Sequence, residues 1–226
     1  MNYLEVMKEY SDLGSWAIWE STNRDNLFEK ERDLKEDLDF GKYIHILQKT
    51  NCVILGMNPG GIFNEENAKK VSRKTLRTIS RPWNNFHNIG RSRDYLLAQA
   101  IKDTPLRGSY MTDIFPIVGS KSTGVKEFIN AKGNSHFIQK LMIELDSELS
   151  ILLPNDDEVR LFCLGKDTEK WADNYLVNSN LPLKKSYKVF YLPHYSGANR
   201  HVSNDPTKEN YYPKVIRKHL ETYGIL

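Results

Sequence analysis

Polar side chains follow four short apolar runs of the chain, at the point where each run ends. Asn58 lies in residues 57–61, which follow the first run. Asp113 lies at the end of the second run, Lys166 follows the third and His194 follows the fourth. In an open parallel sheet the ligand crevice lies outside the carboxyl ends of the strands. These polar groups should therefore converge on one rim, where an amide, a carboxylate, an ammonium group and an imidazole offer hydrogen bonds to a polar ligand.

Each of these residues also has an ordinary interpretation. The Asn-Pro-Gly-Gly segment at 58–61 is a common turn. An aspartate at a strand end often caps a turn or a helix, and a lone histidine is usually a hydrogen-bonded polar residue or a loop residue. Their joint placement at the ends of successive strands favours a functional site, because the ordinary interpretations give no reason for the coincidence.

The apolar runs also predict the elements that position these residues. Short runs bounded by turn residues alternate with longer amphipathic stretches, which is typical of repeated strand–helix units. We predict strands over 51–56, 109–115, 159–165 and 187–192, and helices over 92–102, 135–150, 168–178 and 210–223. Crossover helices bury parallel strands on both faces, so the pattern predicts a three-layer α/β/α fold with a central four-stranded parallel sheet.

The first fifty residues have a different pattern. Tyr3, Leu4, Met7 and Tyr10 form one helical stripe, and a highly charged segment follows from Asn23 to Phe40. We therefore expect a helical N-terminal cap over 1–50 on an α/β core over 51–226. Both belong to a single domain over 1–226, because residues 154–157 are typical of a turn and not of a linker.

Composition excludes several classes of protein. Cys52 and Cys163 each lie in an apolar run, which excludes a disulfide framework and suits reduced thiols in a cytoplasmic protein. The histidines show no metal-ligand spacing, so we predict no bound metal. The chain opens without the profile of a secretory signal and has no apolar stretch near the roughly 20 residues that cross a bilayer. We expect no membrane function.

A basic stretch free of acidic residues runs from Lys69 to Arg93 and includes the aromatic residues Trp83 and Phe86. The formal net charge of +3 and the pI near 8.7 are mildly basic. The stretch is compatible with nucleic-acid binding. The alternative is a solvated helix face followed by a small aromatic cluster.

Two of the strand-end segments resemble motifs of the uracil-DNA glycosylase superfamily. Residues 53–61, VILGMNPGG, resemble the first motif of its single-strand-selective and mismatch-specific branches, in which a strand ends in Gly-Ile/Met-Asn-Pro-Gly. Residues 192–200, LPHYSGANR, resemble the second, a strand followed by His/Asn-Pro-Ser and a DNA-inserting loop. The two motifs occur in the family's order, so the resemblance covers the core and implies a uracil-DNA glycosylase-like fold.

The resemblance also implies roles for single residues. The amide oxygen of Asn58 would hold the attacking water, and His194 would donate a hydrogen bond to the base oxygen that becomes anionic. An aromatic ring would stack on the base, and we nominate Phe86, with Trp83 or Phe63 as alternatives. The residues implied to bind the base are Gly56, Met57, Pro59, Gly60, Gly61, Phe86, Asp113 and Ser196. Those implied to contact DNA are Arg73, Arg77, Arg81, Lys166, Gly197, Ala198, Asn199 and Arg200.

The chain departs from the family at two places. Asp113 stands where the family presents an asparagine to the base, or Thr112 does if the alignment shifts by one residue. An ionised carboxylate only accepts hydrogen bonds, so it suits guanine or hypoxanthine better than uracil. Tyr195 replaces the usual proline and Ala198 replaces a larger wedge, which favours bases that are already exposed or single-stranded.

We therefore predict a monofunctional DNA N-glycosylase of the base-excision-repair kind, since the motifs indicate no lysine nucleophile. It would remove a damaged or deaminated base from exposed or single-stranded DNA, without a cofactor or an obligate protein partner. One alternative is a catalytically inactive nucleic-acid or nucleotide-binding protein of the same fold, which Asp113, Tyr195 and Ala198 favour. Another is an N-glycosidase of free nucleosides or nucleotides, which would explain the missing wedge.

Overall fold

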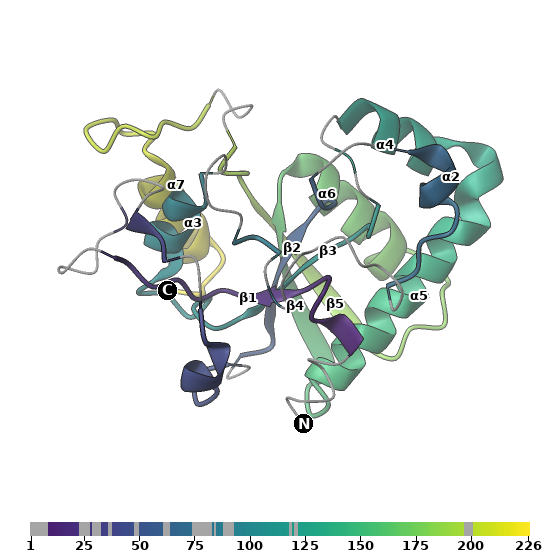
Figure 1. Cartoon of the computed structure of the whole chain (residues 1–226), viewed down its shortest axis with the longest axis horizontal. Helices are drawn as coiled ribbons and strands as arrows, with labels where there is room; N and C mark the ends of the chain where they lie inside the picture. Colours follow the sequence, from purple (N-terminus) through teal and green to yellow (C-terminus); the bar gives the residue numbers. More distant parts are fainter. Residues whose placement is uncertain are drawn as a thin grey trace.

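A computed structural model describes residues 9–22, 28, 33–35, 38–47, 50–60, 64–73, 83, 85–87, 93–117, 119, 122–196 and 201–226. These residues form an α/β architecture around one mixed sheet (Figure 1). The strands are β1 (Ser15–Trp16), β2 (Cys52–Gly56), β3 (Tyr110–Asp113), β4 (Glu158–Leu164) and β5 (Ser186–Leu192). Their order across the sheet is β1-β3-β2-β4-β5.

The four predicted strands are present, and they run parallel to one another as β3, β2, β4 and β5. The prediction of a four-stranded sheet is wrong, because β1 adds a fifth strand antiparallel to β3. Ser15 pairs with Met111, and Trp16 pairs with Tyr110. Two residues are too few to show the alternating pattern by which a strand is predicted from sequence.

Helices cover both faces of this sheet, as Figure 1 shows. On one face, α3 (Asp94–Ile101) and α7 (Tyr212–Thr222) pack over the apolar side chains that include Ile54, Phe162 and Leu192. The other face carries α5 (Ser135–Leu152) and α6 (Lys166–Ala172). The arrangement places one helical layer on each side of the strands.

The predicted helices agree with the structure in their main extents. The helices over 92–102, 135–150 and 210–223 are confirmed as α3, α5 and α7, and the one over 168–178 is α6 followed by a π-helical turn, η4 (Asp173–Val177). Two further helices were not predicted, α2 (Glu65–Ala68) and α4 (Ser122–Asn130), and short 3-10 turns occur as η2 (Phe40–Tyr43) and η3 (Lys132–Asn134). The apolar spacing of α5 explains its clear signal, since Ile138, Leu141, Met142, Leu145 and Leu149 are all buried.

The described part of residues 1–50 differs from the helical N-terminal cap that the sequence predicts, because much of it is strand, turn and irregular structure. It contains β1 and η2, and Trp16, Ala17 and Ile18 are buried against the sheet. The N-terminal segment is therefore part of the core. The stripe residues Tyr3, Leu4 and Met7 lie outside the described residues.

Among the helices in the described ranges, none combines the length and the apolar character that crossing a bilayer requires.

Candidate active site at the carboxyl edge of the sheet

The carboxyl ends of the four parallel strands are level with one another. Gly56 of β2 pairs with Asp113 of β3, and Leu164 of β4 pairs with Leu192 of β5. The ladder continues one residue past the strands, where the Phe115 N–H donates to the Met57 carbonyl at 3.0 Å. Asn58 and His194 follow β2 and β5, which are separated by β4, so their backbones lie roughly 10 Å apart for strands about 4.8 Å apart. The structure thus places both residues at one edge.

The side chain of Asn58 is held in one orientation by two backbone carbonyls. Its Nδ2 donates to the Gly119 carbonyl at 2.8 Å and to the Pro59 carbonyl at 3.0 Å. Both partners are acceptors, so the nitrogen must face them and the amide oxygen must face away. No described residue donates to that oxygen, which leaves it available to accept a hydrogen bond from water.

Gly56, Phe86 and Asp113, three of the residues predicted to bind a base, are in close contact at this edge. A Cβ atom built on Gly56 would lie 2.3 Å from Oδ1 of Asp113 and 2.9 Å from the ring of Phe86. Any other residue at position 56 would displace the carboxylate or the ring. Glycine is therefore required here by the approach of two functional side chains to the end of β2.

Asn85 fixes the carboxylate of Asp113, and it was not among the predicted site residues. Its Nδ2 donates to Oδ2 of Asp113 at 2.9 Å and to the Leu13 carbonyl at 2.6 Å, while its Oδ1 accepts from the Phe86 N–H at 3.1 Å. The side chain thereby connects the N-terminal segment at Leu13, the backbone at Phe86 and the end of β3 at Asp113. A contact between residues 28 positions apart has no signal in local sequence.

The backbone around Asn85 adopts an uncommon conformation on both sides. Trp83 has φ of 61° and Phe86 has φ of 63°, in the left-handed region that costs a non-glycine residue on the order of 1–3 kcal/mol. The surrounding contacts hold this conformation, since the Trp83 N–H donates to the Ser11 carbonyl at 2.6 Å and Ser15 Oγ donates to the Trp83 carbonyl at 2.7 Å. Such strain is often found at functional sites.

Of the two described aromatic candidates for stacking on a base, only Phe86 is available. Trp83 is 3% exposed and packs between Trp16 and Tyr110 in the core. Phe86 is half-buried at the sheet edge beside Asp113. The alternative of Trp83 is therefore wrong, and Phe63 lies outside the described residues.

Asp113 has an unusual environment for a carboxyl group. It is 2% exposed, and burial raises its pKa from 3.8 to about 7, while the hydrogen bond from Asn85 and the positive charge of Arg73 act to lower it. The negative charge of Glu148 adds to the increase. Near neutral pH this carboxyl group therefore exists in both its protonated and its ionised form.

Arg73 was predicted to contact DNA, and this prediction is wrong because the residue is buried. Its guanidinium forms a two-pronged ion pair with Glu148, with Nε to Oε2 at 2.7 Å and Nη2 to Oε1 at 3.1 Å. Its Nη1 donates to the Asp113 carbonyl at 2.7 Å, and Nη2 donates to Thr112 Oγ1 at 2.8 Å. Arg73 therefore holds the end of β3. Thr112, the alternative to Asp113 for contacting a base, instead directs its hydroxyl toward the buried Arg73–Glu148 pair.

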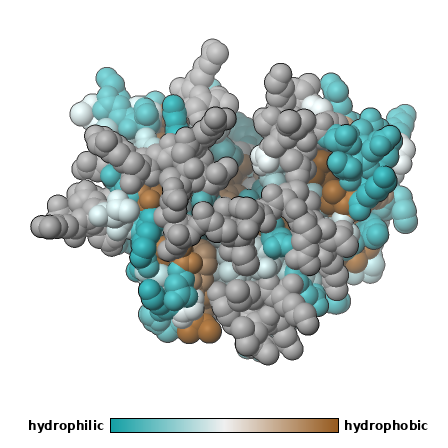
Figure 2. All heavy atoms as spheres, viewed as in Figure 1, coloured by the Kyte–Doolittle hydropathy of each residue, from teal (hydrophilic) through white to brown (hydrophobic). Residues whose placement is uncertain are grey.

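The rest of the basic stretch is only partly described. Lys69 forms an ion pair with Glu65 at 2.7 Å on α2, where Figure 2 shows a hydrophilic surface. Lys166, the first residue of α6, is exposed at the edge of the sheet and its Nζ lies 6.0 Å from the ring centre of Tyr191. Other predicted base or DNA contacts lie outside the described residues: Gly61, Arg77, Arg81, Gly197, Ala198, Asn199 and Arg200.

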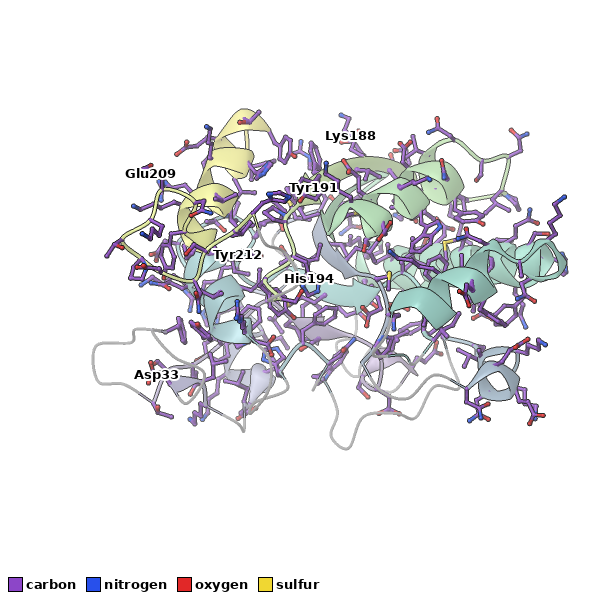
Figure 3. The ribbon with its side chains drawn as sticks, turned by 90° about the horizontal axis from the view of Figure 1, so that it is seen from above. Asp33, Lys188, Tyr191, His194, Glu209 and Tyr212 are labelled. Carbon is purple, nitrogen blue, oxygen red and sulfur yellow. The ribbon has the colours of Figure 1, made fainter. Side chains whose placement is uncertain are left out.

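His194 is a neutral imidazole whose protonated nitrogen can be assigned from its surroundings. The Ser196 N–H donates to Nδ1 at 2.9 Å, so Nδ1 carries no hydrogen and Nε2 is the protonated nitrogen of the neutral ring. Burial lowers the pKa of His194 to about 4. Figure 3 shows His194 just beyond the end of β5, with Tyr191 on that strand and Tyr212 of α7 nearby.

Tyr195 packs against the ring of His194. The two rings stack with centres 4.6 Å apart, and the buried carboxylate of Asp94 on α3 lies close to the hydroxyl of Tyr195. Burial and this carboxylate raise the pKa of Tyr195 well above its usual value, and the nearby Asp113 adds to the increase. The ring is also in edge contact with Tyr212.

The remaining predicted base contacts have modest roles in the structure. Met57 packs against the core, and the Pro59 carbonyl accepts from Gly119 N–H at 3.0 Å as well as from Asn58. A Cβ on Gly60 would meet no described residue within 4 Å, so packing within the described part of the chain does not require glycine there. Within the described ranges no three His, Cys, Asp or Glu side chains are grouped to hold a metal ion.

Comparisons of the chain with protein-family models, with curated proteins and with solved structures found no match.

Proposed function

We propose that this protein hydrolyses the N-glycosidic bond of a damaged or deaminated base in exposed or single-stranded DNA. The observation that carries the proposal is the orientation of Asn58, whose amide nitrogen is held by two carbonyls so that its oxygen faces away from them and accepts no hydrogen bond from any described residue. The same edge presents Phe86, Asp113 and His194. The resemblance of residues 53–61 and 192–200 to the uracil-DNA glycosylase motifs supports the same reaction.

The chemistry needs a placed water and stabilisation of a departing anion. Oδ1 of Asn58 accepts a hydrogen bond from the water, whose oxygen forms a bond to the anomeric carbon as the bond from that carbon to the base breaks. The electron pair leaves with the base, and Nε2–H of His194 donates to the base oxygen that carries the charge. The proton released by the water passes to the base or to solvent. Phe86 stacks on the base and Asp113 reads its edge.

The states of the two polar groups suit these roles. A neutral His194 donates from Nε2 without the cost of placing a full positive charge beside a buried site. A fixed Asn58 avoids the reorganisation that a mobile amide would need at the moment of reaction. Both features are present before any ligand binds.

A panel of single-stranded oligonucleotides carrying uracil, hypoxanthine, xanthine or an alkylated base tests the proposal, with alkali-labile abasic sites as the readout. We expect Asn58→Ala and His194→Ala each to lower kcat by about 10²- to 10³-fold, as the loss of one positioned polar group does in other enzymes. Asn134→Ala and His136→Ala are matched controls. Like Asn58, Asn134 donates from Nδ2 to a backbone carbonyl, that of Phe128, at 2.8 Å. His136 is an exposed histidine on α5, away from the candidate site. If the wild type releases none of these bases, the proposal is wrong.

The burial of Arg73 favours a second candidate, an N-glycosidase of free nucleosides or nucleotides, because it removes one of the predicted DNA contacts. The same bases offered as free nucleosides distinguish the two substrates. A higher kcat/KM for the nucleoside than for the oligonucleotide would favour the second candidate.

A further inference from the structure

The two oxygens of the Asp113 carboxyl group have different surroundings. Oδ2 accepts a hydrogen bond from Nδ2 of Asn85 at 2.9 Å. Asn85 cannot turn its amide over, because its other bonds to the Leu13 carbonyl and the Phe86 N–H would both be lost. Oδ2 therefore stays an acceptor, whatever the charge of Asp113.

Any proton that Asp113 binds must consequently reside on Oδ1. No described residue donates to this oxygen, and it lies over the Cα of Gly56 beside the ring of Phe86. This is the edge where a base stacked on Phe86 would present its hydrogen-bonding groups. Oδ1 thus meets the base either as O–H, which donates, or as O⁻, which accepts.

We propose that Asp113 is the specificity-determining residue of this site, and that its Oδ1 reads the base edge as a donor when protonated and as an acceptor when ionised. The inference rests on the proposed function in one respect, that a base occupies this edge. The protonated form selects bases whose edge presents a ring nitrogen or carbonyl acceptor. The ionised form selects bases whose edge presents an N–H donor, such as an amino group.

Among the described residues, charged and titratable side chains lie near Asp113 on several different elements. Arg73 donates to its backbone carbonyl from the segment after α2, and Glu148 of α5 pairs with Arg73. Tyr195 lies close enough to Asp113 for the charge of Asp113 to raise the pKa of the Tyr195 hydroxyl. His194 is neutral above about pH 4, so it does not titrate with Asp113. Because burial raises the pKa of Asp113 to about 7, both states of Oδ1 are populated at neutral pH.

The experiment compares two bases of nearly equal shape whose edges differ only in hydrogen bonding. Purine offers the N1 acceptor and no donor at this edge, whereas 1-deazaadenine offers the amino donor and no ring acceptor. Each is placed in a single-stranded oligonucleotide on a 2′-fluoro sugar that resists hydrolysis, and Kd is measured by fluorescence anisotropy from pH 5.5 to 8.5 at constant salt. Constant salt matters because phosphate contacts respond to ionic strength.

For the wild type we expect the ratio of the two affinities to reverse across this range. Binding of purine should weaken by about tenfold for each pH unit above the Asp113 titration, and binding of 1-deazaadenine should weaken by about tenfold for each unit below it. Asp113→Asn should prefer purine at every pH, because Asn85 keeps the amide oxygen and turns the Nδ2 donor toward the base. Asp146→Asn is the matched control, since Asp146 is another buried carboxylate, bonded to Tyr187, and its loss should leave the reversal intact.

A second measurement covers the case in which Asp113→Asn does not fold. The ¹³C shift of the Asp113 carboxyl of the wild type should report a pKa raised by the purine oligonucleotide and lowered by the 1-deazaadenine one. A pH-independent ratio, no binding of either oligonucleotide, or an unchanged carboxyl titration would overturn the inference. Cleavage of a panel base with a constant ratio refutes the inference alone. A reversing ratio without any cleavage refutes the proposed hydrolysis and leaves the reading of the edge intact.

Discussion

The two ends of the candidate site hold their polar groups in different ways. At the β3 end, Asp113 is fixed by charged and amide groups, namely Asn85 and the Arg73–Glu148 pair. At the β5 end, His194 packs on the aromatic ring of Tyr195 and accepts a hydrogen bond from the Ser196 backbone N–H. Burial shifts the two pKa values in opposite directions, to about 7 for Asp113 and to about 4 for His194.

Both shifts have the same physical meaning, since burial disfavours the charged form of an acid and of a base alike. Burial lowers the pKa of His194 to about 4, so its imidazole is neutral at pH 7. Asp113 keeps part of its charge, because Asn85 and Arg73 act against the burial. The polar surroundings of Asp113 leave its carboxyl group able to titrate near neutral pH, whereas burial of His194 against an aromatic ring keeps its imidazole neutral.

The largest effect should come from breaking the ion pair at the β3 end. Arg73→Ala leaves Glu148 as an unpaired charge at 0% exposure, which should lower the free energy of unfolding by about 3–5 kcal/mol. Urea unfolding measures this change. The control is Arg217→Ala, which removes an exposed ion pair with Glu221 and should cost about 0–1 kcal/mol.

The double variant Arg73→Met with Glu148→Leu separates charge from packing. Replacing a buried pair by apolar residues of similar size is often neutral, so we expect it to recover much of the lost stability. Its Asp113 should nevertheless titrate higher than in the wild type, because the charge of Arg73 lowers the pKa of Asp113 more than the charge of Glu148 raises it. Equal losses in Arg73→Ala and in Arg217→Ala would contradict the structural role assigned to this pair.

The second prediction uses the opposite signs of the two titrations. The folded-state pKa of Asp113 is raised above its unfolded value, so its contribution to stability is lost as pH rises from about 4 to about 7. The folded-state pKa of His194 is lowered, so its contribution is lost as pH falls from 6.5 to about 4. Relative to wild type, Asp113→Asn should therefore gain stability toward pH 8, and His194→Gln should gain it toward pH 4.5.

Each of these gains should be on the order of 3 kcal/mol at its limit, because one pKa unit corresponds to about 1.4 kcal/mol. Urea unfolding at several pH values measures both slopes. His87, which is buried with a pKa near 4, is present in every variant and cancels in the difference. If the stability difference from wild type changes with pH in the same direction for both variants, the opposite pKa shifts of Asp113 and His194 are contradicted.

The sequence predicts the parts of the site that follow from strand order. Asn58, Asp113 and His194 each come directly after a strong apolar run, and the rule that ligands bind at the carboxyl ends of parallel strands then places them together. Phe86 was nominated from an aromatic cluster, and the structure places it against Gly56. The positions of these residues could be predicted because each follows from a local pattern, while their roles stay predictions.

The supporting contacts could not be predicted, because they join distant residues of ordinary type. Arg73 and Glu148 are 75 positions apart, and each has the sequence context of a surface residue. Asn85 reaches Asp113 across 28 positions from a segment with left-handed backbone conformations that no local pattern indicates. Strand β1 was missed for a related reason, since its two residues gain their role only by pairing with β3.

The smallest expected effect concerns Tyr195, and it tests whether aromatic packing alone fixes His194. Tyr195→Phe keeps the ring that stacks on His194 and removes only the hydroxyl beside the buried carboxylate of Asp94, so stability should fall by about 1–2 kcal/mol, as for the loss of other buried polar contacts. Tyr187→Phe is the matched control, because its hydroxyl donates to Asp146 at 2.7 Å and its loss should cost a similar amount. The two variants should differ in the ¹H–¹⁵N spectrum of His194. Without its hydroxyl the Tyr195 ring gains freedom, water reaches the imidazole more easily, and the pKa of His194 should rise toward 6.5 in Tyr195→Phe and stay low in Tyr187→Phe. If the pKa of His194 is the same in both variants, the hydroxyl of Tyr195 has no part in positioning the imidazole, and stacking is sufficient.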